Sequence, residues 1–279
     1  MNHERKPKLK PLLDTVPPGF IVDTRWLRGR DIDPKSIHDY VARGWLERVI
    51  RGVYQRPLPQ GVQATGKSWE VALLSLQRLM EYNIYLGGES ALNLAGHVHY
   101  LHLGESTPVY LYGDAPSWLE RLPMPERIVV RREMLFGGDR VGIVDSDLAA
   151  RANGWAVDVW RWPVSASSPE RAILEALNEL PGNASFEHID RIFEGLVSLR
   201  PALLMELLTA CRSVKVRRLF FVFADRHGHR WRKYLDAARI DFGSGPRALV
   251  DCGRFHPIYR ISVPHFLVST RPVSLENNA

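Results

Sequence analysis

Two short segments of the sequence have the residue types of a nucleotidyltransferase site. Residues 87–90 (GGES) could form a glycine turn that holds a nucleotide, and Asp145 and Asp147 could bind metal ions. A two-metal site needs carboxylates that are held close together. Residues 94–103 contain no acidic residue, however, and the two aspartates follow the glycines by some 57 residues with no strand pattern around them. A plain turn, in which glycine gives the backbone its freedom, explains the glycines better.

The histidines form two clusters that could bind a metal. The first is His97, His99 and His102, and the second is His227 and His229. Metal sites usually add a Cys, Asp or Glu at a set spacing, and neither cluster has one in place. Cys211 and Cys252 lie 41 positions apart, without a CxxC spacing. We therefore expect loop or surface histidines, no metal, no cofactor and no catalytic residue; Ser90 has no evident base beside it.

The composition is that of a globular protein with a mild basic excess. The 279 residues are 45% hydrophobic and 24% charged, which excludes a disordered tail protein, and at roughly 150 residues per domain they suggest about two domains. The net charge is +6. Residues 1–56 hold twelve basic and seven acidic side chains, so that most of the excess falls in one fifth of the chain. Such a segment is a candidate for binding a polyanion such as DNA.

A break at residues 57–61 (PLPQG) divides the sequence. We expect an α+β protein in which a winged helix-turn-helix domain (1–57) and a linker (58–66) precede a larger mixed α/β domain (67–279). Helical patterns cover 68–80, 90–95, 185–197, 200–211 and 214–225, and a further helix follows Ser168 with proline at its first position. Strand patterns cover 83–86, 108–112, 127–131, 156–162, 248–251 and 257–263.

The first 56 residues have the element order of a winged helix. The pattern predicts a helix over 8–16, a strand over 20–22, a short helix capped by Asp23 or Thr24, and a helix that Asp33 caps and Pro34 begins. Residues 45–49 and 53–56 then read as two strands of a basic hairpin, the wing. We expect Trp26, Tyr40 and Trp45 in the core.

The second of the two short helices carries polar and basic side chains away from its apolar face, as a helix in the major groove requires. The hairpin adds arginines that phosphates would attract. The predicted DNA-binding residues are Arg28, Lys35, Ser36, His38, Asp39, Arg43, Arg48, Arg51 and Arg56.

A second basic stretch lies at 212–233, where phenylalanines alternate with cations and Asp225 is the single acid. The pattern predicts a buried helix face flanked by a basic surface, with Trp231 in the core. This surface could contact DNA, RNA or an acidic partner, or it could be a solvated helix face. Its candidate residues are Lys215, Arg217, Arg218, Arg230, Arg232 and Lys233.

Several of these segments resemble AbiEi-type antitoxins of type IV toxin–antitoxin systems. The N-terminal winged helix of that family is similar to residues 19–33 (GFIVDTRWLRGRDID), 40–45 (YVARGW) and 51–57 (RGVYQRP). Its C-terminal antitoxin domain is similar to 168–175 (SPERAILE), 216–220 (VRRLF) with Trp231, and 240–245 (IDFGSG). The resemblance covers most of the chain, densely at 19–57 and 167–249.

The resemblance implies two activities and no enzyme. The winged helix would bind repeats in the promoter of its own operon and repress it, and the C-terminal domain would oppose a nucleotidyltransferase-like toxin, with or without direct contact. Two alternatives stay open: a stand-alone regulator whose second domain senses a ligand, and a nucleotidyltransferase or nuclease targeted to DNA. No run approaches the roughly 20 apolar residues of a membrane span, and the N-terminus has no secretory pattern, so we expect a cytoplasmic protein.

Overall fold

The computed structural model describes residues 8–60, 68–97, 108–132, 135–146 and 162–268. The chain forms two compact units. The first unit consists of residues 1–86, 101–133 and 144–166, and the second unit of residues 87–100, 134–143 and 167–279. Helices and sheets are mixed, as the sequence predicts. The expected domain boundary at 58–66 stays a prediction, because residues 61–67 lie outside the described ranges.

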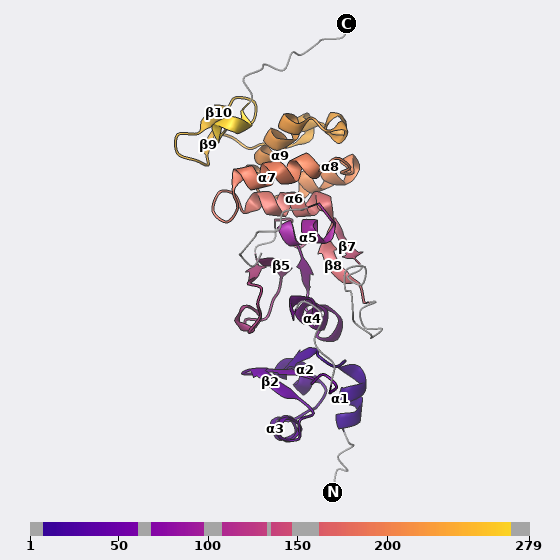
Figure 1. The fold of residues 1–279 in the computed structure, drawn as a ribbon. Helices are drawn as coiled ribbons and strands as arrows, with labels where there is room; N and C mark the ends of the chain where they lie inside the picture. The colour runs from indigo at the N-terminus through magenta and orange to yellow at the C-terminus, as the bar shows by residue number, and fades with distance from the viewer. Residues whose placement is uncertain (1–7, 61–67, 98–107, 133–134, 147–161, 269–279) are drawn as a thin grey trace. The chain divides into compact units, whose positions relative to one another are not determined.

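The first unit begins with a winged helix-turn-helix (Figure 1). Its elements are α1 (Leu9–Thr15), β1 (Ile21–Asp23), α2 (Thr24–Gly29), α3 (Pro34–Ala42), β2 (Glu47–Ile50) and β3 (Val53–Gln55). The three strands form an antiparallel sheet in the order β1-β3-β2, with Tyr54 opposite both Val22 and Arg48. Every element that the sequence predicts in this segment is confirmed within two residues.

The two tryptophans of the winged helix differ in burial. Trp26 is buried as predicted, whereas Trp45 is 42% exposed and its neighbour Leu46 only 1% exposed. Trp45 and Leu46 form the bend between α3 and β2, and there Leu46 faces the core. Placing Trp45 in the core was therefore wrong.

The rest of the first unit is built around a mixed sheet. A helix α4 (Ser68–Leu74) continues as a π-helical turn η1 (Ser75–Leu79) and precedes the strands, and η2 (Leu119–Arg121) is a single 3-10 turn. The strands are β4 (Ile84–Leu86), β5 (Val109–Gly113), β6 (Ile128–Arg131), β7 (Ile143–Ser146) and β8 (Val164–Ser167), in the order β6-β5-β4-β8-β7. β4 pairs antiparallel with β5 and parallel with β8, and β5 pairs parallel with β6.

Two of these strands differ from the sequence prediction. Asp145 lies on β7, so the expectation that no strand surrounds it was wrong; the strand is exposed or half-buried throughout and has no apolar alternation to reveal it. β8 consists of small residues (VSAS) and was not predicted. The predicted strand at 156–162 lies outside the described residues, except for Trp162, which belongs to no strand.

The winged helix is hydrogen-bonded to the remainder of the first unit through the start of α2. The buried carboxylate of Asp23 accepts from the backbone N–H of Trp26 (2.8 Å), the hydroxyl of Tyr82 (2.6 Å) and the indole N–H of Trp118 (3.2 Å). The indole of Trp26 donates to the Leu79 carbonyl at the end of η1. These bonds join residues up to 95 positions apart.

The second unit is a helical layer with a small sheet (Figure 1). Its α-helices are α5 (Gly88–Leu94), α6 (Pro169–Asn178), α7 (Phe186–Gly195), α8 (Pro201–Ala210) and α9 (Val214–His227), and its short 3-10 turns are η4 (Arg230–Tyr234), η5 (Ala237–Arg239) and η6 (His265–Leu267). The strands are β9 (Arg247–Ala248), β10 (Arg254–His256) and β11 (Ile261–Val263). The sequence predicts each of the α-helices found in the described residues of this unit.

Aromatic side chains of α7 and α9 fill the core of the second unit. Phe193 stacks on Phe223 with ring centroids 4.9 Å apart, and Trp231 is 3% exposed, as predicted. The late strands were placed less well. The predicted strand at 257–263 begins with a turn in which Arg260 has a φ of 51°, so that only Ile261–Val263 is extended.

Removing the Asp23 carboxylate tests how far the first unit depends on it. We expect Asp23→Ala to lower the free energy of unfolding by about 2–4 kcal/mol, because the change removes a helix N-cap and leaves the Trp118 indole N–H buried without a partner. Urea denaturation followed by tryptophan fluorescence measures the loss. Asp14→Ala, at an exposed carboxylate of α1, is the control. Equal stability of the two variants would contradict the assignment.

Candidate nucleic-acid interface

Capping residues fix the two helices of the helix-turn-helix. Asp23 accepts from the backbone of α2 as described, and Asp33 accepts from the backbone N–H of Ser36 at 2.9 Å, with Pro34 at the first position of α3. Asp31 has a φ of 57° in the turn between the helices. Ile32 and Ile37 are buried, which holds α3 against the core. The outward face of α3 is therefore set by local sequence.

The outward face of α3 is polar and open to solvent. Lys35, His38, Asp39 and Arg43 are exposed, as the sequence predicts. Ser36 is half-buried, and its hydroxyl donates to the second oxygen of Asp33 at 3.2 Å. Burial, together with the negative charges of Asp33 and Asp39, raises the pKa of Tyr40, which keeps its phenol neutral. The exposed groups include donors and acceptors of the kind that read base edges.

The wing is attached to the first of the two helices. The backbone N–H and the hydroxyl of Thr24 donate to the carbonyl of Gly52, at 2.9 and 3.1 Å. Gly52 has a φ of +83°, a conformation that side chains disfavour. The adjoining Arg51 is exposed at the tip of the hairpin, and Arg48 is exposed on β2. The wing therefore holds two cations at a fixed place beside α2.

A cleft of about 400 Å³ lies between the helices and the wing. It brings together four of the predicted residues, which are Arg28 from α2, His38 from α3, and Arg48 and Arg51 from the wing. Ile37, Val41 and Tyr54 are among the residues that complete its lining. Three guanidinium groups at one concave face can neutralise phosphates of a nucleic-acid backbone. We call this face the reading face, and it includes the exposed side chains of α3.

Arg56, one of the predicted DNA-binding residues, forms hydrogen bonds within the winged helix. The guanidinium of Arg56 donates to the carbonyls of Leu13 and Val16, the latter at 2.7 Å, and so binds the end of α1. These carbonyls have no partner within their own helix. Arg56 is half-buried and outside the cleft, so the structure gives it a role in holding the fold together.

Half of the second basic stretch is also internal. Arg218 is fully buried and donates to the carbonyls of Phe242, Gly243 and Arg260, and Arg217 is 8% exposed. Lys215 donates to two carbonyls at the end of α6, and burial lowers its pKa. Arg232 pairs with Asp225 at 2.6 Å. Arg230 and Lys233 are exposed, so the expected basic surface is reduced to these two candidates.

The residues that suggested a nucleotidyltransferase are occupied by other contacts. The backbone N–H of Gly88 donates to the buried carboxylate of Glu175 (2.8 Å), so this donor of the glycine turn already has an acceptor. Asp145 pairs with Arg78 at 3.1 Å, and Asp147 lies outside the described residues. Among the described residues, no group of three His, Cys, Asp or Glu side chains could hold a metal ion.

The histidine clusters divide in the same way. His227 contacts Asp190 (2.7 Å) and His229 contacts the Phe193 carbonyl (2.7 Å), so both are held by α7 rather than free at the surface. His227 is the last residue of α9 and His229 lies in the loop after it, and both are half-buried. His97 is half-buried, and His99 and His102 lie outside the described residues.

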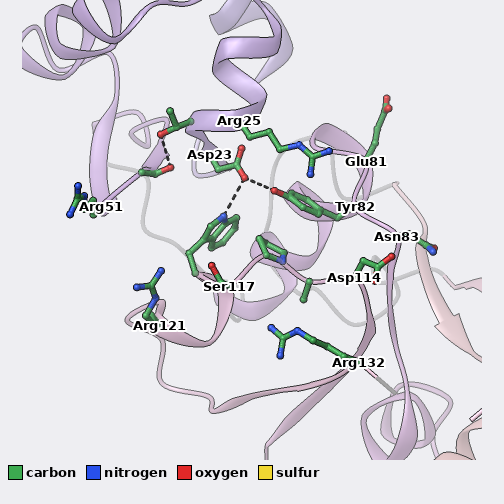
Figure 2. A pocket seen from close by; sticks show the side chains of 15 residues that line it. Asp23, Arg25, Arg51, Glu81, Tyr82, Asn83, Asp114, Ser117, Arg121 and Arg132 are labelled. Atoms are coloured by element: carbon green, nitrogen blue, oxygen red, sulfur yellow. Dashed lines mark hydrogen bonds between the residues drawn. The ribbon is translucent and has the colours of Figure 1, made fainter. Parts of the chain in front are cut away.

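A second cleft, of about 730 Å³, was not foreseen. It borders Asp23 on the other side of the wing tip, and Figure 2 shows the side chains around it. Its arginines are Arg25, Arg51, Arg121 and Arg132. They come from four separate parts of the sequence, and each reads alone as an ordinary surface charge. No local pattern in the sequence could have assembled them.

Comparison with known protein families divides the chain into an N-terminal domain and a larger second region. Two family models match the chain: one described as "Transcriptional regulator, AbiEi antitoxin N-terminal domain" matches residues 5–103, and one described as "Transcriptional regulator, AbiEi antitoxin, Type IV TA system" matches residues 106–264. A comparison with curated proteins found no match.

A solved structure has a similar fold. The crystal structure of the RV2827C protein from Mycobacterium tuberculosis superposes with a TM-score of 0.53 at 18% sequence identity, over 91% of this chain and 88% of that one. At this identity the likeness concerns the fold alone. In the described residues no helix is long and apolar enough to cross a membrane. The family models together cover nearly the whole chain, and the chain therefore belongs to the AbiEi antitoxin family of transcriptional regulators in type IV toxin–antitoxin systems, which is not a family of enzymes.

Proposed function

We propose that this protein is an antitoxin that represses its own operon and neutralises a nucleotidyltransferase-like toxin in the cytoplasm. The observation that carries the DNA-binding half is the reading face, where Arg28, His38, Arg48 and Arg51 meet beside the exposed side chains of α3. The toxin-neutralising half is supported by membership of the family.

The reading face divides naturally between two tasks. α3 would enter the major groove, where Lys35, Ser36, His38 and Asp39 could contact base edges. Arg28, Arg43, Arg48 and Arg51 would contact phosphates and fix the register of the protein on the duplex. The partner would be operator DNA, with inverted repeats upstream of the operon. In this proposal residues 1–57 read DNA, 58–66 link, and 67–279 serve the antitoxin activity.

The antitoxin activity would use the second part of the chain, where Arg230 and Lys233 are the exposed candidates of the basic stretch. Neutralisation could proceed by direct contact with the toxin or by competition for its target. A regulator that only senses a ligand would share the winged helix but would not relieve toxicity. Co-expression therefore separates the two functions.

The wing can be tested with the promoter DNA. We expect the Arg48→Ala/Arg51→Ala variant to bind its upstream DNA at least tenfold more weakly. The slope of log affinity against log salt concentration should fall by the amount that about two phosphate contacts contribute, because each neutralised phosphate releases counterions. Gel shifts over a range of salt concentrations measure both. Arg48→Lys/Arg51→Lys keeps the charge and should keep most of the affinity. If the alanine double variant binds like wild type, the wing assignment is wrong.

The exposed face of α3 predicts sequence preference rather than overall affinity. His38→Ala should reduce discrimination between the operator and a mutated operator by about 5- to 150-fold, the range of one good base contact, while the salt dependence stays unchanged. Ser36→Ala should act in the same direction, although its hydroxyl also contacts Asp33. Competition gel shifts measure the ratio. A uniform loss on every sequence would instead make His38 a backbone contact.

Co-expression tests the antitoxin activity. We expect the chain to restore growth of cells that express the nucleotidyltransferase-like protein encoded beside it. The Arg48→Ala/Arg51→Ala variant should restore growth equally, because neutralisation is assigned to the other part of the chain. If cells stay growth-arrested while the soluble protein accumulates, the antitoxin half of the proposal fails and the DNA-binding half stands.

A further inference from the structure

The second cleft, lined by the residues in Figure 2, lies entirely within the first unit. It is formed by the start of α2, the wing tip, the turn after η1, the segment from Asp114 to Arg121 and the residue after β6. At about 730 Å³ it falls in the range of 300–1,000 Å³ that is typical of small-molecule sites. None of its residues belongs to the exposed face of α3.

The cations of the second cleft are available to a ligand. All four arginines are exposed. In the described part of the chain, the guanidinium groups of Arg51 and Arg121 have no hydrogen-bond or ion-pair partner, and that of Arg132 has only a long contact of 4.0 Å with Glu120. Guanidinium groups in this arrangement suit phosphate, which each can bind through two parallel hydrogen bonds.

The opposite side of the cleft has acceptors and amides. Figure 2 shows Glu81, Asn83 and Asp114 on one side of Tyr82, and Arg51 and Arg121 on the other side. Glu81 and Asp114 are exposed carboxylates that can accept hydrogen bonds from hydroxyl or amino groups. A lining with both signs of charge disfavours a continuous polyanion and suits a small molecule that is anionic at one end only.

The floor of the cleft is rigid, because its aromatic groups are already hydrogen-bonded. The Tyr82 hydroxyl and the Trp118 indole N–H both donate to Asp23. Burial and the bond to Asp23 raise the pKa of Tyr82 to about 12, so the phenol stays neutral at physiological pH. Trp118 is only 8% exposed, so the ring surface open to a ligand is that of the half-buried Tyr82, which the Arg25 guanidinium approaches to 5.6 Å from the ring centroid. Aromatic rings can stack on a planar base.

We propose that the second cleft binds a phosphorylated small molecule of nucleotide size. Arg51, Arg121 and Arg132 hold its phosphates, and Glu81, Asn83 and Asp114 face the hydroxyl and amino groups at its other end. Arg51 lines both clefts. A phosphate bound by Arg51 in the second cleft removes that cation from the reading face, so the ligand weakens DNA binding; this consequence rests on the proposed function.

Calorimetry on the full chain without DNA tests the proposal directly. The probes are ATP, GTP and inorganic pyrophosphate, with adenosine and guanosine as uncharged controls. We expect at least one triphosphate to bind, and Arg121→Ala/Arg132→Ala to bind it at least tenfold more weakly. Arg127→Ala, at an exposed arginine outside the cleft, should bind like wild type. Circular dichroism and the melting temperature confirm that the variants are folded.

Two results would overturn the proposal. The first is that neither triphosphate nor pyrophosphate binds the wild-type chain at millimolar concentration, or that the folded double variant binds them unchanged. The second is that Arg121→Ala/Arg132→Ala weakens promoter binding while no nucleotide binds, which would assign the arginines to the DNA backbone. Because the calorimetry contains no DNA, its outcome is independent of whether the chain is a repressor.

Discussion

The buried carboxylate of Asp23 is the interaction on which the first unit depends. It begins α2 by accepting from the Trp26 backbone, and it accepts from Tyr82 and Trp118 on the other side. A buried carboxylate is stable only when its acceptor positions are filled, so these contacts must form together. The direct consequence is that helix α2 is hydrogen-bonded to the segments before β4 and after β5.

The positions of both clefts depend on the hydrogen bonds around Asp23. Thr24 follows Asp23 directly and holds the wing tip through Gly52, and Thr24 and Arg51 line both clefts. The tip of the wing is thus hydrogen-bonded to Thr24, the residue that follows the buried carboxylate. A change in the second cleft has a short path to the reading face, through two hydrogen bonds to the carbonyl of one glycine. Arg51 is the charged side chain that lines both clefts.

The sequence predicts the elements well where local physics decides them. Helices α3 and α9 follow from a capping residue and a run of apolar residues on one face, and α6 from proline at its first position with the same spacing. The sequence does not reveal β7, because that strand is exposed or half-buried, or β8, because it consists of small residues. The reading face could be predicted because its residues lie within one segment of 24 positions, from Arg28 to Arg51. The second cleft could not, because Arg25 and Arg132 meet only through the fold.

Counting charges along the sequence misjudged the arginines for a related reason. A guanidinium has five donors and can satisfy several carbonyls at chain ends and turns, where the backbone has no partner of its own. Arg56 does so at the end of α1 and Arg218 at the loop around Gly243. Burial of such a group costs free energy that only these bonds offset. From the sequence alone, an arginine whose side chain points into the core looks the same as an arginine at the surface that binds phosphate.

The second unit also contains a buried carboxylate whose acceptor positions are filled, that of Glu175. Glu175 accepts from the backbone N–H of Gly88, the hydroxyl of Ser167 and the guanidinium of Arg171, which itself donates to the carbonyls of Asp139 and Val141. Gly88 is buried and has a φ of +53°, a conformation that favours glycine at this contact. Residues 87–90 suggested a nucleotide turn, and residues 168–175 resemble part of the antitoxin domain. The two segments meet in one buried contact, in which the Gly88 N–H already has the Glu175 carboxylate as its acceptor.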